Sequence, residues 1–262
     1  MELCLDGRAS TQRSVVALGM FDGVHLGHQV LLSKAKHIAQ QENVPMVCFT
    51  FAAHPLELVA PEECPPMLTT LDERAKLMEK AGVDIFCAMP FTLETRDMPP
   101  AEFVGQLVRR WHPVAVVAGY NYTYGRKAEG NAAWLTMMGP ALGFQTEIVP
   151  EIRLGGESIS STRIRGLLAQ GKAGEAARLL GRPYLRQAEV MDCAQNRFEA
   201  VLIPNGKQNV GPGKYRALID AAGKSWPAAV LMDADGHARG TLHAPLSQRE
   251  EIAIRFLRGA NE

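Results

Sequence analysis

The sequence has no excess charge of either sign and no long apolar run. Its 262 residues include 28 Lys and Arg and 28 Asp and Glu, which gives a formal net charge of zero. A neutral chain lacks the broad basic surface that nucleic acid requires, so we expect no nucleic-acid partner. No apolar stretch reaches the length of about 20 residues that spans a bilayer, and residues 1–14 are mixed and polar rather than signal-like. We therefore expect no membrane partner either.

Cysteine is scarce, and three familiar catalytic loops are missing. The cysteines are scattered, odd in number and never spaced as Cys-x-x-Cys, which favours reduced thiols in a cytoplasmic protein and argues against a zinc site. They are Cys4, Cys48, Cys64, Cys87 and Cys193. The sequence contains no lysine-bearing Walker loop, no Gly-x-Gly-x-x-Gly after the first expected strand and no Gly-x-Ser-x-Gly elbow. A P-loop kinase and a dinucleotide dehydrogenase are therefore not supported.

What the sequence does contain is an alternation of apolar runs and helical patterns. Buried strands are expected at residues 15–18, 45–51, 83–89, 114–118 and 144–149. Helical patterns lie between them, at residues 29–40, 71–81, 99–108 and 131–142. This spacing predicts an α/β domain with a parallel sheet and helices on both faces. In such sheets, ligands bind beyond the carboxyl ends of the strands, where the strand order reverses.

The composition changes after Pro183. Short apolar or alternating runs at residues 198–203, 215–219 and 228–232 are separated by Gly-containing turns, which predicts a small antiparallel β module. The last pattern, at residues 248–257, places Ile252 and Phe256 on one face and predicts a C-terminal helix. We therefore predict two domains, residues 1–184 and residues 185–262.

The loop at residues 19–28 joins the first expected strand to the first helix. It reads Gly-Met-Phe-Asp-Gly-Val-His-Leu-Gly-His. A helix N-terminus presents N–H groups and partial positive charge, the glycines let a ligand approach the backbone, and His25 and His28 add side-chain donors. This combination predicts a phosphate-handling site. The plainer alternatives are two solvated histidines and, for Asp22, an aspartate that hydrogen-bonds its own turn.

Two further loops follow strands at the same expected edge of the sheet. His54 and Pro55 follow the second strand, where a His-Pro pair is often only a turn. Asn121, Tyr122 and Tyr124 follow the fourth strand and offer an amide and aromatic rings to a planar ligand, although a packed loop would use the same residues.

A second helix opening lies at residues 159–165. Ser160 or Ser161 suits the N-cap, and Arg163 and Arg165 lie in the first turns. Because the helix dipole disfavours cations there, an anionic group such as a bound phosphate is expected to compensate. The alternative is ordinary capping with a surface charge.

Together these stretches resemble the bacterial FAD synthetase family, the bifunctional riboflavin kinase/FMN adenylyltransferases. Residues 21–28 and 160–165 resemble its two nucleotidyltransferase signatures, and residues 49–55 and 119–125 resemble two further segments. The resemblance implies a Rossmann-like nucleotidyltransferase domain that transfers AMP from ATP to FMN with Mg²⁺ and releases FAD and pyrophosphate. ATP and FMN would then be its small-molecule partners.

The resemblance also implies a role for each matching residue. The catalytic residues would be His25, His28 and Arg165, and the FMN phosphate would be the nucleophile, so that catalysis rests on positioning and electrostatics. The ATP-binding residues would be Gly19, Phe21, Asp22, Gly23, Gly27, Ser160, Ser161, Thr162 and Arg163. The flavin-binding residues would be His54, Pro55, Asn121, Tyr122 and Tyr124. No side chain is assigned to a metal, so Mg²⁺ would arrive with ATP.

Residues 185–262 depart from the family pattern. Its kinase modules carry a Gly-rich entry and a Pro-Thr-Ala-Asn segment, and this chain has neither between Tyr184 and Gly213. We predict a shortened barrel, kept for stability or interaction and without riboflavin kinase activity. Two alternatives stay open, a nucleotidyltransferase for another phosphorylated acceptor and a non-catalytic flavin- or nucleotide-binding regulator. The oligomeric state stays open as well.

Overall fold

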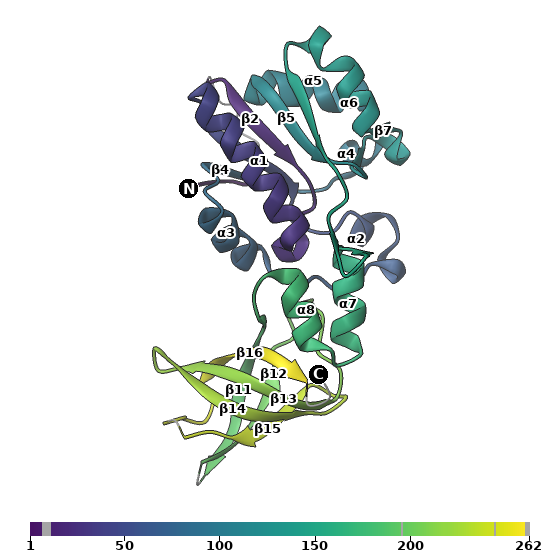
Figure 1. The fold of residues 1–262 in the computed structure, drawn as a ribbon. Coiled ribbons are helices and arrows are strands. Elements are labelled where there is room, and N and C mark those ends of the chain that lie inside the picture. The colour runs from purple at the N-terminus through teal and green to yellow at the C-terminus, as the bar shows by residue number, and fades with distance from the viewer. Residues whose placement is uncertain (7–11, 195, 244, 260–262) are drawn as a thin grey trace. The chain divides into compact units, whose positions relative to one another are not determined.

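The structure, a computed structural model, describes residues 1–6, 12–194, 196–243 and 245–259. It divides into two compact units (Figure 1). Unit 1 comprises Met1–Pro65 and Leu71–Arg153, and unit 2 comprises Pro66–Thr70 and Leu154–Glu262. The short segment Pro66–Thr70 thus groups with the C-terminal part of the chain, although the residues on both sides of it belong to unit 1.

Unit 1 is built on a six-stranded sheet with the order β1-β4-β3-β2-β5-β8. The strands are β1 (Glu2–Cys4), β2 (Ser14–Leu18), β3 (Met46–Phe51), β4 (Ile85–Met89), β5 (Pro113–Gly119) and β8 (Gln145–Val149). Every neighbouring pair runs parallel. The five predicted strands are confirmed, and β1 is a sixth that the sequence did not indicate.

Helices cover both faces of this sheet. Val15 and Ala17 of β2 belong to one core with α1 (Leu26–Glu42) and α3 (Leu71–Lys80). Val16 and Leu18 belong to the other core, with α5 (Pro100–Trp111) and α6 (Ala132–Met138). Because both faces are covered, all five residues of β2 are buried, which explains why residues 15–18 are all apolar. The predicted α/β fold is confirmed.

Short elements complete the loops of unit 1. They are η1 (Asp22–Val24), α2 (Leu56–Val59), η2 (Pro61–Glu63), α4 (Leu93–Asp97), β6 (Thr123–Tyr124), η3 (Arg126–Ala128), β7 (Gly130–Asn131) and η4 (Pro140–Leu142). The helix predicted at residues 131–142 is therefore shorter than expected. Helix α6 ends at Met138, because Pro140 has no N–H with which to continue the helical hydrogen bonds and instead opens a 3₁₀ turn.

The described residues of unit 2 form two helices and a barrel. The helices are α7 (Ser161–Ala169) and α8 (Ala173–Leu180), and the hairpin before α7 pairs β9 (Arg153–Leu154) with β10 (Glu157–Ser158). The barrel closes in the order β11-β12-β15-β14-β13-β16, with antiparallel neighbours (Figure 1). Its strands are β11 (Tyr184–Ala194), β12 (Arg197–Leu202), β13 (Gly213–Ala221), β14 (Lys224–Met232), β15 (His237–Thr241) and β16 (Glu251–Gly259).

The predicted β barrel is thus confirmed, but the predicted C-terminal helix is wrong. Residues 248–257 contain most of β16. Ile252 and Phe256 are four residues apart, a spacing that shares a face in a helix and also in a strand. Ile254 between them decides, because it is fully buried as well, and inward residues therefore recur with period two. The domain boundary predicted between residues 184 and 185 stays a prediction; the barrel begins at Tyr184.

Candidate active site

The loop that follows β2 turns into α1 through three residues with positive φ. The φ angle is 51° at Phe21, 78° at Gly23 and 39° at Val24. Glycine adopts this conformation readily, whereas it strains an aromatic residue and, above all, a β-branched one. Strain of this kind persists only where surrounding contacts enforce it, and it gathers at functional sites. The loop is therefore a candidate site on its backbone geometry as well as its sequence.

His25 is the N-cap of α1. Its Nδ1 accepts a hydrogen bond of 3.3 Å from the backbone N–H of His28. Because Nδ1 accepts, the neutral ring carries its proton on Nε2, which makes that atom a donor. The two imidazole rings stack with their centroids 3.6 Å apart and their planes at 15°. The structure thus brings both predicted catalytic histidines together at the start of the helix.

His28 is held in its neutral form. Burial lowers the pKa of its imidazole well below the usual value, and the charges of His25 and Arg74 lower it further. Within the described part of the chain, its Nδ1 is buried and has no hydrogen-bond partner. The ring contacts the edge of fully buried Phe21, at 5.3 Å between centroids, and a Cβ on Gly19 would lie 3.0 Å from that Phe21 ring. Phe21 therefore packs against His28, and the lack of a Cβ at Gly19 leaves room for the Phe21 ring.

A buried arginine that the sequence analysis did not identify joins the loops after β2 and β3. The guanidinium of Arg74 on α3 donates to the carbonyl oxygens of Met20 at 3.1 Å and Phe51 at 2.9 Å. It also donates to the carbonyl of Ala52 at 2.6 Å. Burial lowers the pKa of Arg74, and the neighbouring charge of Asp22 counteracts that shift. Asp22 is itself buried in the loop of residues 19–28, which we call the histidine loop, so its charge interacts with Arg74 away from solvent.

The histidine loop borders the point where the strand order reverses. Strand β2 lies between β3 and β5, so the chain first winds in one direction, through β3 and β4, and then places β5 on the other side of β2. In open α/β sheets the crevice at the carboxyl ends of such strands is the usual ligand site. The loops predicted at residues 19–28, 52–55 and 119–130 all follow carboxyl ends of parallel strands, as expected.

The loop after β3 contains a capping interaction. The Nδ1 atom of His54 accepts a hydrogen bond of 3.2 Å from the backbone N–H of Leu56, at the start of α2. This is the turn role that the His-Pro pair indicated. The predicted flavin contact of His54 and Pro55 stays a prediction.

The loop after β5 contains one exposed and two packed candidates. Asn121 is exposed, immediately beyond the strand. Tyr124 is buried beside Phe103, with 5.2 Å between ring centroids, and Tyr122 stacks on Tyr124 at 5.8 Å. Tyr124 is therefore a core residue, which was the plainer interpretation of this loop. Contact of Asn121, Tyr122 or Tyr124 with a flavin stays a prediction.

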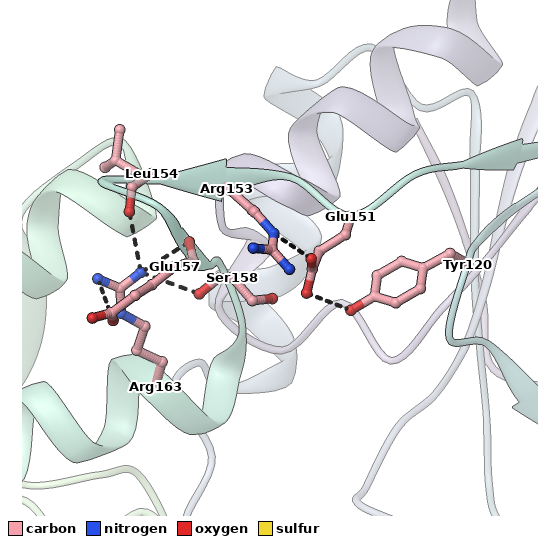
Figure 2. A network of polar contacts seen from close by, with 7 residues as sticks. All are labelled: Tyr120, Glu151, Arg153, Leu154, Glu157, Ser158 and Arg163. Carbon is pink, nitrogen blue, oxygen red and sulfur yellow. Dashed lines mark hydrogen bonds and ion pairs between the residues drawn. The ribbon is translucent and has the colours of Figure 1, made fainter.

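A polar network fixes the backbone at the end of β5. The Tyr120 hydroxyl donates to Oε1 of Glu151 at 3.1 Å, and Oε2 of Glu151 pairs with Arg153 (Figure 2). The backbone N–H of Tyr120 also donates to the carbonyl of Val149 at 2.9 Å. These contacts tie the segment beyond β8 to the loop beyond β5 and so steady the residue that precedes Asn121.

The second predicted phosphate element lies in unit 2, at the start of α7. Ser160 is the N-cap, and its Oγ accepts a hydrogen bond of 3.2 Å from the N–H of Arg163. Ser161 and Thr162 occupy the first turn, where backbone N–H groups face outward from the helix end. The predicted cap is confirmed, and phosphate binding by these residues stays a prediction.

The two arginines of α7 have different surroundings. Arg163 donates to the carbonyls of Glu157 and Ser158, each at 3.2 Å, and its guanidinium pairs with the Glu157 carboxylate at 3.0 Å (Figure 2). The anion expected to compensate this cation is therefore a side chain of the protein itself. Arg165 donates from Nε to the carbonyl of Pro66 at 2.7 Å. Arg163 steadies the β9–β10 hairpin, and its predicted ATP contact stays a prediction.

Neither a metal-binding cluster of side chains nor a membrane-spanning helix occurs in the described part of the chain. The described residues include no group of three or more His, Cys, Asp or Glu side chains that could hold a metal ion. In the same part of the chain, no helix is long and apolar enough to cross a bilayer.

A comparison with known families decides the relationship. The sequence matches the family described as FAD synthetase over residues 7–163. The chain belongs to the FAD synthetase family. The matched range includes the histidine loop, the loops after β3 and β5, and the N-terminus of α7.

Curated relatives of this FAD synthetase family member are named bifunctional riboflavin kinase/FMN adenylyltransferase. The protein of Listeria monocytogenes is 38 % identical over 178 residues, which cover 68 % of this chain and 56 % of that protein. The protein of Bacillus subtilis is 32 % identical over 66 % of this chain and 54 % of its own length. The Escherichia coli protein is 30 % identical over 70 % of this chain and 59 % of its own length. The matches thus span little more than half of these relatives.

A solved structure supports the fold of this FAD synthetase family member over almost its whole length. The crystal structure titled a macrolide-efflux protein from Streptococcus pneumoniae superposes with a TM-score of 0.88 and 23 % identity. The superposition covers 98 % of this chain and 89 % of the Streptococcus pneumoniae chain. At this identity the likeness shows the fold alone.

Proposed function

We propose that this chain is an FMN adenylyltransferase, which transfers AMP from ATP to FMN and forms FAD and pyrophosphate. One observation carries the proposal: His25 and His28 stack at the N-terminus of α1, beside the reversal of strand order. Nucleotide phosphates bind at such helix N-termini in open α/β sheets. Membership of the FAD synthetase family supports FMN as the acceptor.

The reaction needs no nucleophile from the protein. An oxygen of the FMN phosphate attacks the α-phosphorus of ATP and forms a new P–O bond. The bond between the α-phosphorus and the oxygen that bridges to the β-phosphate breaks, and its electron pair leaves with pyrophosphate. Negative charge grows on the oxygens around the α-phosphorus. The protein therefore acts by aligning the two substrates and neutralising that charge.

The two histidines suit this task through different atoms. The cap bond leaves the proton of neutral His25 on Nε2, which can donate to a phosphate oxygen. His28 is neutral in the free protein, and a bound polyphosphate would raise its pKa and favour the protonated, cationic ring. The N-terminal N–H groups of α1 add further positive potential. Mg²⁺ enters as part of the substrate, Mg-ATP.

The remaining candidate residues would bind the β- and γ-phosphates of ATP and the flavin ring of FMN. Ser161, Thr162 and Arg165 would hold the β- and γ-phosphates, since a helix N-terminus and a guanidinium both suit phosphate oxygens. Asn121 and His54 would border the flavin, with Pro55, Tyr122 and Tyr124 behind them. None of these assignments requires a protein-bound metal.

We also propose that the chain lacks riboflavin kinase activity. The support is in the sequence between Tyr184 and Gly213, which has neither the Gly-rich entry nor a Pro-Thr-Ala-Asn segment. The barrel strands themselves are present and closed, so the module keeps its architecture without that signature.

One assay separates these claims. The purified protein is incubated with Mg-ATP and either FMN or riboflavin, and the flavins are then resolved by chromatography. We expect FAD from FMN and unchanged riboflavin. Formation of FMN from riboflavin would overturn the kinase claim alone. A folded protein that makes no FAD would overturn the main claim and favour another phosphorylated acceptor or a non-catalytic binder.

A further inference from the structure

The segment Pro66–Thr70 pairs with the barrel module. The N–H of Met67 donates to the carbonyl of Gly206 at 2.9 Å, and the N–H of Gln208 donates to the carbonyl of Met67 at 2.7 Å. These two bonds form an isolated parallel bridge between Met67 and Lys207. We call it the 67–207 bridge. It consists of backbone groups only, so side-chain patterns in the sequence do not reveal it.

The barrel side of the 67–207 bridge is rigidly held. Arg186 of β11 is 2 % exposed, and its guanidinium donates to the carbonyls of Lys207 at 2.7 Å and Ile203 at 2.8 Å. Lys207 is 6 % exposed, and its ammonium donates to the carbonyl of Leu185 at 2.7 Å. The Tyr184 hydroxyl donates to the carbonyl of Gln208 at 2.6 Å. Two buried cations and a tyrosine thus fix the backbone at residues 203–208.

The other side of the bridge is connected to Arg165 of α7. The carbonyl of Pro66, one residue before Met67, accepts the hydrogen bond of 2.7 Å from Nε of Arg165. A guanidinium is planar and presents its donors in a fixed fork, so a bond at Nε sets the direction of the whole group. The contacts therefore run without a break from the barrel through the 67–207 bridge and Pro66 to Arg165.

We propose that residues 206–208 of the barrel are a positioning element for Arg165 in adenylyl transfer. The inference rests on the proposed function, in which Arg165 binds the phosphates of ATP. A flexible arginine loses rotamer entropy when it is fixed on a ligand, and a side chain that is already oriented loses less. The barrel fixes the Pro66 carbonyl and thereby orients Arg165 before ATP arrives. This gives the barrel a task in a chain that lacks the kinase signature.

The bridge can be broken from either side by removing one N–H. Met67→Pro removes the donor to Gly206 and changes no residue of the barrel, whereas Gln208→Pro removes the donor to Met67. Met67→Leu and Gln208→Ala keep both N–H groups and are the matched controls. Calorimetric titration of the full-length protein with Mg-ATP gives the Kd, and steady-state assays give the KM for ATP and for FMN.

We expect each proline variant to weaken Mg-ATP binding by about tenfold, the effect of losing one well-oriented charged hydrogen bond, with the KM for FMN within twofold of wild type. The two controls should match the wild type. Equal Kd values for Mg-ATP in the wild type and in a folded Met67→Pro variant would overturn the inference.

A double variant separates positioning from general destabilisation. In an Arg165→Ala background the bridge has no guanidinium to orient, so Met67→Pro should add no further loss of Mg-ATP affinity. A positioning role thus predicts strongly non-additive Kd values, and an additive second loss would contradict it.

Failure of the proposed function is distinguishable from failure of this inference. A wild type that binds Mg-ATP but makes no FAD overturns FMN as the acceptor, while the double-variant comparison of Kd values still decides the role of the bridge. A wild type that does not bind Mg-ATP overturns both.

Discussion

The imidazole ring of His25 lies 3.6 Å from that of His28, and its Nδ1 accepts the backbone N–H of His28. One contact therefore does two things. It caps α1 and fixes the tautomer of His25, and it places a second ring where burial and neighbouring positive charge keep it neutral. The positions of the two rings are thus fixed before a ligand binds, as electrostatic catalysis requires.

Replacement of the second histidine should affect turnover more than binding. His28→Gln keeps a polar side chain but removes the imidazole that we propose contacts the α-phosphate of ATP. We expect kcat for FAD formation to fall by about 10²–10³-fold, because the lost contact is strongest in the transition state, and the Kd of FMN to change by less than threefold. Steady-state kinetics and a flavin-binding titration measure the two quantities. A variant with wild-type kcat would remove His28 from the mechanism.

The cap and the chemistry of His25 can be separated by two substitutions. Asn accepts N-cap hydrogen bonds well, whereas Ala cannot accept one, so His25→Ala should lower the free energy of unfolding by about 1 kcal/mol more than His25→Asn does. Both variants lose the imidazole and should lose turnover to a similar extent. Urea denaturation measures the stability of each. If the two variants are equally stable, the cap bond contributes nothing.

The depressed pKa of His28 makes stability depend on pH in a defined window. Below about 6.5, the usual pKa, the unfolded chain binds a proton at this residue and the folded protein does not, until the lower folded pKa is reached. The free energy of unfolding should therefore fall as the pH drops below 6.5, by up to about 1.4 kcal/mol per pH unit from this group. Above that pH the group adds no dependence.

His28→Gln is the control for this titration, since glutamine does not ionise. Denaturation curves of both proteins between pH 5 and about 8 isolate the contribution of the histidine. Parallel curves for wild type and variant would show that His28 titrates in the folded protein as it does in the unfolded chain.

Loss of Arg74 should destabilise unit 1 severely. Arg74→Met removes three buried hydrogen bonds, to the carbonyls of Met20, Phe51 and Ala52, and removes a positive charge that interacts with the buried Asp22. We expect a loss of about 3–5 kcal/mol in the free energy of unfolding. Lys76→Met, at an exposed position of the same helix, should change it by less than about 0.5 kcal/mol. Similar effects of the two substitutions would contradict the structural role of Arg74.

Much of the fold follows from local patterns in the sequence. The residues of strands β2 and β3 are mostly apolar because helices cover both faces of the sheet. A run of apolar residues is visible in the sequence, so these strands could be predicted. The N-cap at Ser160 could also be predicted, because capping is a hydrogen bond between residues only three positions apart in the sequence. The C-terminal strand was readable as well, because Ile252, Ile254 and Phe256 alternate with period two, but the four-residue spacing of Ile252 and Phe256 was interpreted as helical.

The features that sequence reasoning missed are those that depend on distant groups. Arg74 lies among charged residues on α3, and only its contacts with carbonyls from two other loops distinguish it from its exposed neighbour Lys76. Val24 adopts a positive φ that a β-branched residue disfavours, so the preference of the residue itself does not predict it. The 67–207 bridge joins segments far apart in the chain through backbone atoms alone, so no side-chain pattern encodes it.

The central claim is that an FMN phosphate oxygen displaces pyrophosphate from the α-phosphorus of ATP, and the fate of a label on that phosphorus tests it most directly. The protein is incubated with FMN, Mg²⁺ and ATP labelled at the α-phosphate, and the products are separated. We predict that the label appears in FAD, one equivalent per flavin, and that the pyrophosphate released is unlabelled. Label that stays in ATP while FMN is unchanged, or that appears in an adenylylated product other than FAD, would contradict the account.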